Sequence, residues 1–371
     1  MFRWLLLLAL LTSSASFAWG FDGHRRLASL MQDALAQDHC LRAWFAGRQT
    51  TALQDSACNP DRWRAMDPAE APRHFLEVDW VTPITNYPRD SAAVQALLGA
   101  RSAINNGIVP WHVETKYGEL VAAFRANDAT AILRTAFVMS HYVFDSCSVL
   151  HDTRNFDPNN GLHARWESDM LNVLANINGV TTLAATYYGT AGRADPRNNI
   201  FDMVLTGNGL VTELIAADTA AAGSIPSLYA STRDLTARRW ADGVTVMSSL
   251  LWTAWAEAGS PELTGFSPSC SRAVPVADIV IRGYPPAGGF FHAPDAGLPD
   301  AGPFELDAGV DGGSGVDGGS GGGTGQGGGG GDPGVAPTGC GCSSGDALLA
   351  FAGLLAFVGR RRWGGQCHQS P

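Results

Sequence analysis

Positive charge, alternating patterns and membrane-length apolar runs are all scarce in this chain of 371 residues. Only 16% of the residues are charged, and 25 Lys and Arg stand against 35 Asp and Glu, which gives a net charge of −10. Because duplex nucleic acid is normally held by a broad basic face, this balance argues against that class of protein. It leaves open an enzyme that binds phosphates through metal ions. We find no internal repeat.

The N-terminal segment, residues 1–18, has the pattern of a secretory signal peptide. Arg3 precedes an apolar run from Leu5 to Leu11, and Ser16-Phe17-Ala18 forms a small-residue cleavage site. A transmembrane helix is the alternative, but the run is too short to span a bilayer alone. We therefore expect an exported protein, extracellular or on the outer surface, whose mature chain begins at Trp19.

The C-terminal part contains a segment rich in Gly, Asp, Pro and Ser, from roughly Pro294 to Gly339, with no Lys or Arg. Such a composition cannot bury enough apolar surface to fold, so residues 291–339 are predicted to be a disordered, acidic linker.

Residues 340–371 follow as a tail with a Cys pair, an apolar stretch from Ala347 to Val358 and the cluster Arg360-Arg361-Arg362. A short apolar span before basic residues is typical of a membrane stop. The tail resembles the C-terminal sorting tags of myxobacterial surface proteins, which implies attachment to the cell envelope, or release from it.

Four cysteines, Cys40, Cys58, Cys147 and Cys270, lie in the part of the chain expected to fold. Four cysteines allow three pairings, and sequence alone does not choose among them. Export favours at least one disulfide, and buried free thiols are the alternative.

Residues 19–290 are predicted to form one all-α domain, a compact bundle of many helices with long loops. Apolar residues recur at helical spacing in five segments: His24–Ala36, Ser91–Ile104, Asp128–Phe144, Leu162–Ile177 and Ser227–Ala258. One short strand is predicted at Ala277–Arg282, and Gly-Ile-Val-Pro at 107–110 is expected to separate two helices.

Two His/carboxylate pairs carry the strongest chemical signal. His141 and Asp145 are four residues apart, as are His163 and Glu167, and His151 lies between the pairs. Residues four apart share one face of a helix, so each pair can offer two ligands to one ion. A single pair would more often be an exposed salt bridge. Two pairs with a third His between them indicate a metal site.

Further candidate ligands lie upstream. Asp61 could otherwise be a helix N-cap, and His74 a buried histidine with ordinary partners. The expected mature chain starts with Trp19-Gly20-Phe21-Asp22-Gly23-His24.

With these residues the chain resembles the superfamily that joins bacterial zinc-dependent phospholipase C to the fungal and plant single-strand-specific zinc nucleases. The resemblance spans roughly Trp19 to Ala258 and implies an all-helical, secreted phosphodiesterase, here expected as a monomer, with three zinc ions in a cleft. The ligands it implies are Trp19, His24 and Asp145 for the first ion, Asp61, His74, His141 and the shared Asp145 for the second, and His151, His163 and Glu167 for the third.

The sequence departs from the family pattern at two positions. Phe144 stands where relatives have Gly before the shared Asp, and Val149 stands where they have Pro. The spacing from Asp61 to His74 is also short, which leaves Asp55 and Asp67 as competitors for the same role.

The resemblance leaves the substrate divided between phospholipid, slightly favoured, and single-stranded nucleic acid. Phe75 could stack on a base or line a choline pocket, with core packing as the alternative. Glu77 could contact a base edge or a choline, or remain solvated.

The implied mechanism uses hydroxide generated between two zinc ions that share Asp145, with the third ion neutralising the phosphate and leaving group. Asp61 would orient or deprotonate the water, and no Ser or Cys nucleophile is needed. A non-catalytic surface module stabilised by zinc is the rival from another class.

Overall fold

The computed structural model describes residues 19–281, which belong to one unit and form helices without a single β-strand among them. The segments predicted as signal peptide, linker and sorting tail lie outside these residues, as do 282–290 of the predicted domain. The α-helices are α1 (Gly20–Leu30), α2 (Cys40–Ala46), α3 (Thr51–Ser56), α4 (Asn59–Arg64), α5 (Ser91–Leu98), α6 (Ala100–Asn105), α7 (Val109–Arg125), α8 (Ala129–Asp145), α9 (Leu162–Ala164), α10 (Leu174–Ala185), α11 (Pro196–Asn208), α12 (Val211–Ala221) and α13 (Ile225–Glu257). Short 3₁₀ turns are η1 (Pro68–His74), η2 (Val78–Trp80), η3 (Ile84–Asn86) and η4 (Val149–His151), and η5 (Arg165–Asp169) is a π-helical turn.

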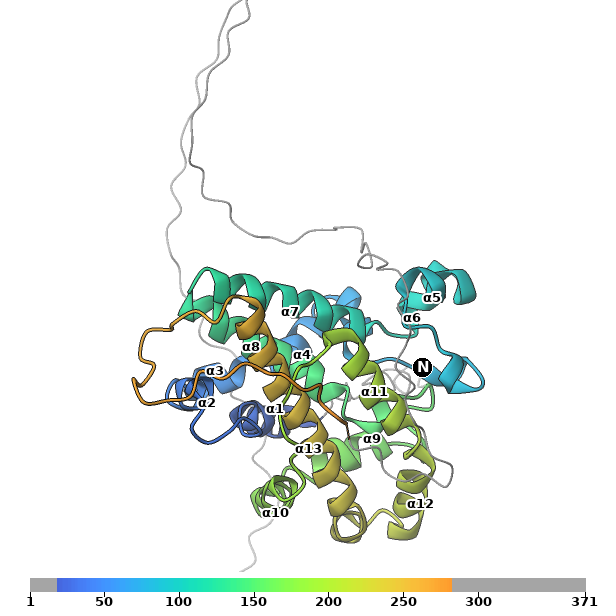
Figure 1. Ribbon diagram of the computed structural model, residues 1–371. Coiled ribbons are helices and arrows are strands. Elements are labelled where there is room, and N and C mark those ends of the chain that lie inside the picture. The colour runs from blue at the N-terminus through green and yellow to red at the C-terminus, as the bar shows by residue number, and fades with distance from the viewer. Residues whose placement is uncertain (1–18, 282–371) are drawn as a thin grey trace, which may run out of the picture. The chain divides into compact units, whose positions relative to one another are not determined.

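The longest helix, α13, runs through the middle of the bundle and packs against α7, α8, α10, α11 and α12 (Figure 1). It begins after Ser224, whose hydroxyl accepts a hydrogen bond from the Ser227 amide, and Pro226 fits the first turn, where no backbone donor is needed. Its bounds confirm the helix predicted at Ser227–Ala258.

Helices α7 and α8 are neighbours, and α8 confirms the helix predicted at Asp128–Phe144. Asp128 caps α8 by accepting from the amides of Thr130 and Ala131. The last ten residues of α8 are buried all round, so its end lies inside the bundle and carries His141 and Asp145 into the interior.

A cluster of buried tryptophans holds Trp19, the first residue that the structure describes, against the end of α8. The ring of Trp19 lies 4.9 Å from that of Trp166 and 5.8 Å from that of Trp240, measured between centroids. Its indole N–H donates to the carbonyl of Phe144 at 2.8 Å. Trp19 is therefore fixed beside the backbone that leads into Asp145.

Three predicted helices differ from what forms. The helix predicted at His24–Ala36 begins earlier and ends at Leu30. Ser91–Ile104 is divided into α5 and α6 at Gly99, whose φ of 81° no right-handed helix can contain. Leu162–Ile177 is divided as well, because the π-helical turn η5 follows α9 and the helix restarts only at Leu174.

The strand predicted at Ala277–Arg282 is wrong for the part that the structure describes. Only an isolated bridge between Arg193 and Asp278 is present, with no neighbouring strand to extend it. The separation of two helices at 107–110 is confirmed, since α6 ends at Asn105 and α7 begins at Val109.

One disulfide, Cys40–Cys270, joins α2 to the segment after α13, which confirms the expectation of at least one. The segment is also held by backbone hydrogen bonds from Cys40 to Ser271 and from Ser271 to Asp38. Cys58 and Cys147 are buried free thiols.

Among residues 19–281, no single helix has the length and hydropathy of a membrane span; only the bent pair α11 and α12 meets the length and composition test together.

Candidate metal centre

The candidate ligands gather in the interior from seven elements that are far apart in sequence. Three groups of three side chains have their ligand atoms within 4.8 Å of one another: His24, Asp61 and His141; His74, His141 and Asp145; and His151, His163 and Glu167. All eight side chains are buried. These groups could each hold a metal ion.

Asp145, at the end of α8, faces three histidines with its two oxygens. Oδ1 lies 3.2 Å from Nε2 of His24, and Oδ2 lies 2.9 Å from Nδ1 of His74 and 3.2 Å from Nε2 of His141. One carboxylate thus serves histidines on two sides, which is the arrangement that a bridging ligand between two ions requires.

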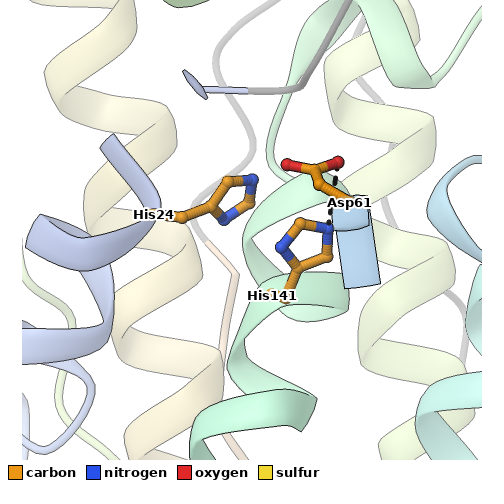
Figure 2. A group of neighbouring side chains, drawn as sticks. All are labelled: His24, Asp61 and His141. Atoms are coloured by element: carbon orange, nitrogen blue, oxygen red, sulfur yellow. Dashed lines mark ion pairs between the residues drawn. The ribbon is translucent and has the colours of Figure 1, made fainter. Parts of the chain in front are cut away.

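The pair His24 and His141 connects α1 to α8 across this centre (Figure 2). Their rings are stacked at 3.9 Å between centroids, and Asp61 projects from α4 toward them, with Oδ1 3.7 Å from Nε2 of His141. Nδ1 of His141 lies 2.8 Å from the carbonyl of Ala57. Donation from Nδ1–H to this carbonyl leaves Nε2 free to bind an ion.

Of the three aspartates considered for the upstream position, only Asp61 lies at the cluster. Asp61 is fully buried in the first turn of α4, where Cys58 rather than Asp61 is the N-cap, so the N-cap alternative is wrong. Asp55 instead pairs with Arg25 and Arg62, and Asp67 caps η1 through the amide of Ala69.

The third group lies on η4, α9 and η5. Oε2 of Glu167 is 2.6 Å from Nε2 of His163 and 3.8 Å from Nε2 of His151, and Ser148 donates to its other oxygen. Nδ1 of His151 lies 2.7 Å from the main-chain carbonyl of His74. The backbone of one group therefore orients a side chain of the other.

The donor atoms are suited to a cation because they lack other partners. Apart from the close contacts above, no hydrogen bond among the described residues satisfies either nitrogen of His24 or His163, either oxygen of Asp61, Oδ1 of Asp145 or Nε2 of His151. Buried polar atoms left unpaired are costly, and nitrogen and carboxylate ligands without a thiolate suit zinc and similar ions. The residues present therefore fit a metal centre.

Charge is distributed unevenly between the two aspartates. Burial raises the pKa of Asp61. For Asp145 burial acts in the same direction, but His141, His24 and His74 outweigh it and hold its pKa well below the usual value. Burial opposes protonation of His141, yet Asp145 and Asp61 raise its pKa to about 9. The surrounding histidines therefore favour the ionised form of Asp145, whereas burial disfavours the ionised form of Asp61.

Glu70 is a functional candidate that the sequence did not indicate. It is 2% exposed, and its Oε1 lies 3.7 Å from Nε2 of His74, on the side of that ring opposite Asp145. Tyr142 donates to the same oxygen, and Arg73 pairs with the other. At 3.7 Å the two atoms are too far apart for a hydrogen bond, but the charge of a carboxylate on this side favours a proton on Nε2 and leaves Nδ1 for an ion. The i, i+4 spacing of Glu70 and His74 was the available signal.

The two predicted substrate residues have structural partners. Phe75 is half-buried and packs on Gly107, where an added Cβ would lie 2.7 Å from its ring. Glu77 accepts from the indole N–H of Trp80 at 2.7 Å, and burial raises the pKa of its carboxyl. Neither residue belongs to the three groups of candidate metal ligands among the described residues, and their role with a substrate stays a prediction.

Phe144 and Val149, the two residues that differ from the pattern of the resembled superfamily, are both packed in the core. The Phe144 ring lies against α13 at Gly243, where an added Cβ would be 2.9 Å from Cδ1. Val149 is buried in η4. Both side chains belong to the hydrophobic core.

Comparison with known proteins finds no family model that matches the chain and no curated protein with significant similarity to it. The centre is therefore described by its geometry and chemistry alone.

Proposed function

We propose that the protein is a zinc-dependent hydrolase of phosphodiesters with three ions in its centre. The observation that carries this proposal is the position of Asp145 between His24 on one side and His74 and His141 on the other. A second, separate set of buried donors, His151, His163 and Glu167, supports a third ion beside the shared pair.

The chain's own residues divide the work. Asp145 would be the ligand shared by two ions, and the histidines around it would complete their ligand sets. Asp61, whose pKa burial raises, is suited to hold or accept a proton from water. Zinc, when bound, supplies acidification of water and neutralisation of phosphate charge. Trp19 would offer its α-amino group and carbonyl as ligands once the preceding residues are removed; in the full chain its carbonyl accepts a hydrogen bond from the Gly23 amide.

Phospholipid is the substrate that the sequence resemblance slightly favours. Single-stranded nucleic acid is the second candidate, and a specific observation favours it. The ring centroid of Phe156, a side chain that is 53% exposed, lies 6.3 Å from that of His163. Separately, Trp80 donates a hydrogen bond to Glu77, and the Arg154 guanidinium lies 5.2 Å from the Trp80 ring centroid. Phe156, exposed and near the candidate ligand His163, would suit stacking on a base, and Trp80 with Arg154 would offer a second stacking surface.

A zinc-stabilised module without activity is the remaining alternative. A structural zinc site is normally closed by four protein ligands. The group of His151, His163 and Glu167 offers three, which leaves a position for water or substrate and supports an enzyme.

The test is hydrolysis of a chromogenic phosphodiester by the exported protein, with and without chelator, alongside zinc analysis. Asp145→Asn should lose activity, while Asp55→Asn, which alters only the pairs with Arg25 and Arg62, should retain it. Three zinc ions without turnover would support the module, and absence of zinc would refute the proposal. Phosphatidylcholine and single-stranded DNA assayed in parallel decide the substrate class.

A further inference from the structure

Arg239 is a fully buried arginine in the middle of α13. Its Nε–H donates to the carbonyl of Cys147 at 2.9 Å, and its Nη2 donates to the carbonyls of Ser146 at 3.3 Å and Met203 at 2.8 Å. Nη1 donates to Asp242 at 3.2 Å. Each of its three nitrogens thus donates a hydrogen bond inside the bundle, to backbone carbonyls or to one carboxylate.

Two of these carbonyls belong to the turn that follows Asp145. The last carbonyls of a helix have no partners within that helix, so buried helix ends need donors from elsewhere. Arg239 supplies them at the end of α8, directly after the shared carboxylate. It fixes the backbone that sets the direction of the Asp145 side chain.

The same guanidinium also lies near Asp152, at the other end of the segment that runs from Asp145 to Asp152. Its Nη2 lies 3.8 Å from Oδ2 of Asp152, which is fully buried and follows the candidate ligand His151. Arg239 therefore contacts the residues directly after Asp145 and the residue directly after His151. One end carries the ligand shared by two groups, and the other carries a ligand of the third.

Gly207 in α11 provides the space for this contact. A Cβ added there would lie 1.8 Å from Oδ2 of Asp152 and 2.9 Å from Nη2 of Arg239. Glycine is unfavourable inside a helix relative to alanine, so the position is explained by the room that Asp152 needs.

We propose that Arg239, with Asp152 and Gly207, is a positioning unit that sets the spacing between the centre at Asp145 and the third group at His151. The inference rests on the proposed metal centre. An arginine is required because its planar fork bonds several acceptors at once, whereas a lysine ammonium is a compact charge on a flexible stem.

Two variants test the unit without touching a ligand. Arg239→Lys keeps the charge but loses the fork, and Gly207→Ala pushes on Asp152 at the His151 end. Matched controls are Arg238→Lys, on the same helix in an exposed pair with Asp234, and Gly118→Ala, in α7 with open space around it. Stepwise chelator competition gives the zinc affinities, and His163→Ala identifies the step that belongs to the third group.

Gly207→Ala should weaken zinc at the third group by about 10–100-fold, the usual effect of changing a residue behind a ligand, and leave the other two within about threefold. Arg239→Lys should weaken all three. Neither control should change any. Gly207→Ala is the variant that separates positioning from stability, because a purely structural role would lower stability in urea unfolding of the metal-free protein and weaken every zinc equally.

Normal zinc affinities in Gly207→Ala, or in folded Arg239→Lys, would overturn the inference. So would uniform weakening in Gly207→Ala. Wild-type protein that binds no zinc would instead refute the proposed function, which keeps the two failures apart.

Discussion

Replacing Glu70 by Gln tests the most specific feature that the sequence did not predict. The change keeps the size of the side chain and an oxygen for Tyr142, but removes the charge 3.7 Å from Nε2 of His74. It also removes the pairing with Arg73, whose side chain is 29% exposed.

The expected loss follows from these contacts. A partner behind a ligand histidine is typically worth about 10–100-fold in metal affinity, which is about 1.4–2.7 kcal/mol at 1.36 kcal/mol per factor of ten. Zinc bound at His74 and Asp145 should weaken by this amount, while zinc at His151, His163 and Glu167 should not. The metal-free protein should lose about 1–3 kcal/mol, because hydrogen bonds to a buried charge are disrupted.

Chelator competition measures the zinc affinities, and urea unfolding measures the stability. The control is Glu119→Gln, which disrupts the exposed pair with Lys116 on α7 and should cost at most about 1 kcal/mol and no zinc affinity. Equal zinc affinities in Glu70→Gln and wild type would show that Glu70 does not orient His74 and would refute the reasoning.

Four further predictions concern Asp145, the N-terminus expected at Trp19, the disulfide and a titrating helix cap. Asp145→Asn should abolish phosphodiester hydrolysis and lower zinc content in elemental analysis, because an amide lacks the charge that faces three histidines. Protein that begins at Trp19 should bind one zinc more than protein with a few residues added before it, because only a free α-amino group is a usable ligand near neutral pH. Replacing Cys40 and Cys270 by Ala should lower the free energy of unfolding in urea by about 2–5 kcal/mol, because the bond closes a loop of 230 residues. Burial lowers the pKa of His39, whose Nδ1 caps α2, so its contribution to stability is present above pH ~6.5 and lost as pH falls toward the lowered value. Urea midpoints of wild type and His39→Asn, whose cap does not titrate, should therefore converge at low pH.

Each of these predictions has an outcome that contradicts it. Normal activity and zinc in Asp145→Asn would remove the shared carboxylate from the site. Equal zinc content in the two N-terminal forms would leave Trp19 as a packed aromatic. The disulfide variant should keep its full zinc content, because α2 carries no candidate ligand, and loss of zinc would reveal a link between them. A constant difference between the His39 midpoints at all pH values would exclude the cap as the titrating group.

The sequence predicted the elements whose signals are local. The apolar spacing in α8 and α13 determines both helices, and the His/carboxylate spacing predicted side chains that the structure brings together. Features that depend on a distant partner or on a backbone angle could not be predicted from the sequence. The strand at 277–282 needed a neighbour that only Arg193 supplies, and the break at Gly99 depended on a backbone angle rather than on apolar spacing.

The remaining misses have the same origin. In the sequence, Glu70 and Arg239 look like ordinary charged residues. Only the folded chain places Glu70 beside His74 and Arg239 at the end of α8. The choice of Cys40 and Cys270 among three pairings is likewise made by the packing of α2 against the segment after α13.

The disulfide also determines how the domain would respond to mechanical load. A pull on the chain beyond Ile281 would first separate the two backbone hydrogen bonds between Arg193 and residues 277 and 279. It would then meet Cys270, where covalent bonding transfers the force to Cys40 and α2. On the way it would break the hydrogen bond from the Trp252 indole of α13 to the Ala273 carbonyl, and at Cys270 the load divides between α2 and the main chain that leads back to α13. The disulfide would thereby divert part of the tension into α2, a helix that carries no candidate ligand.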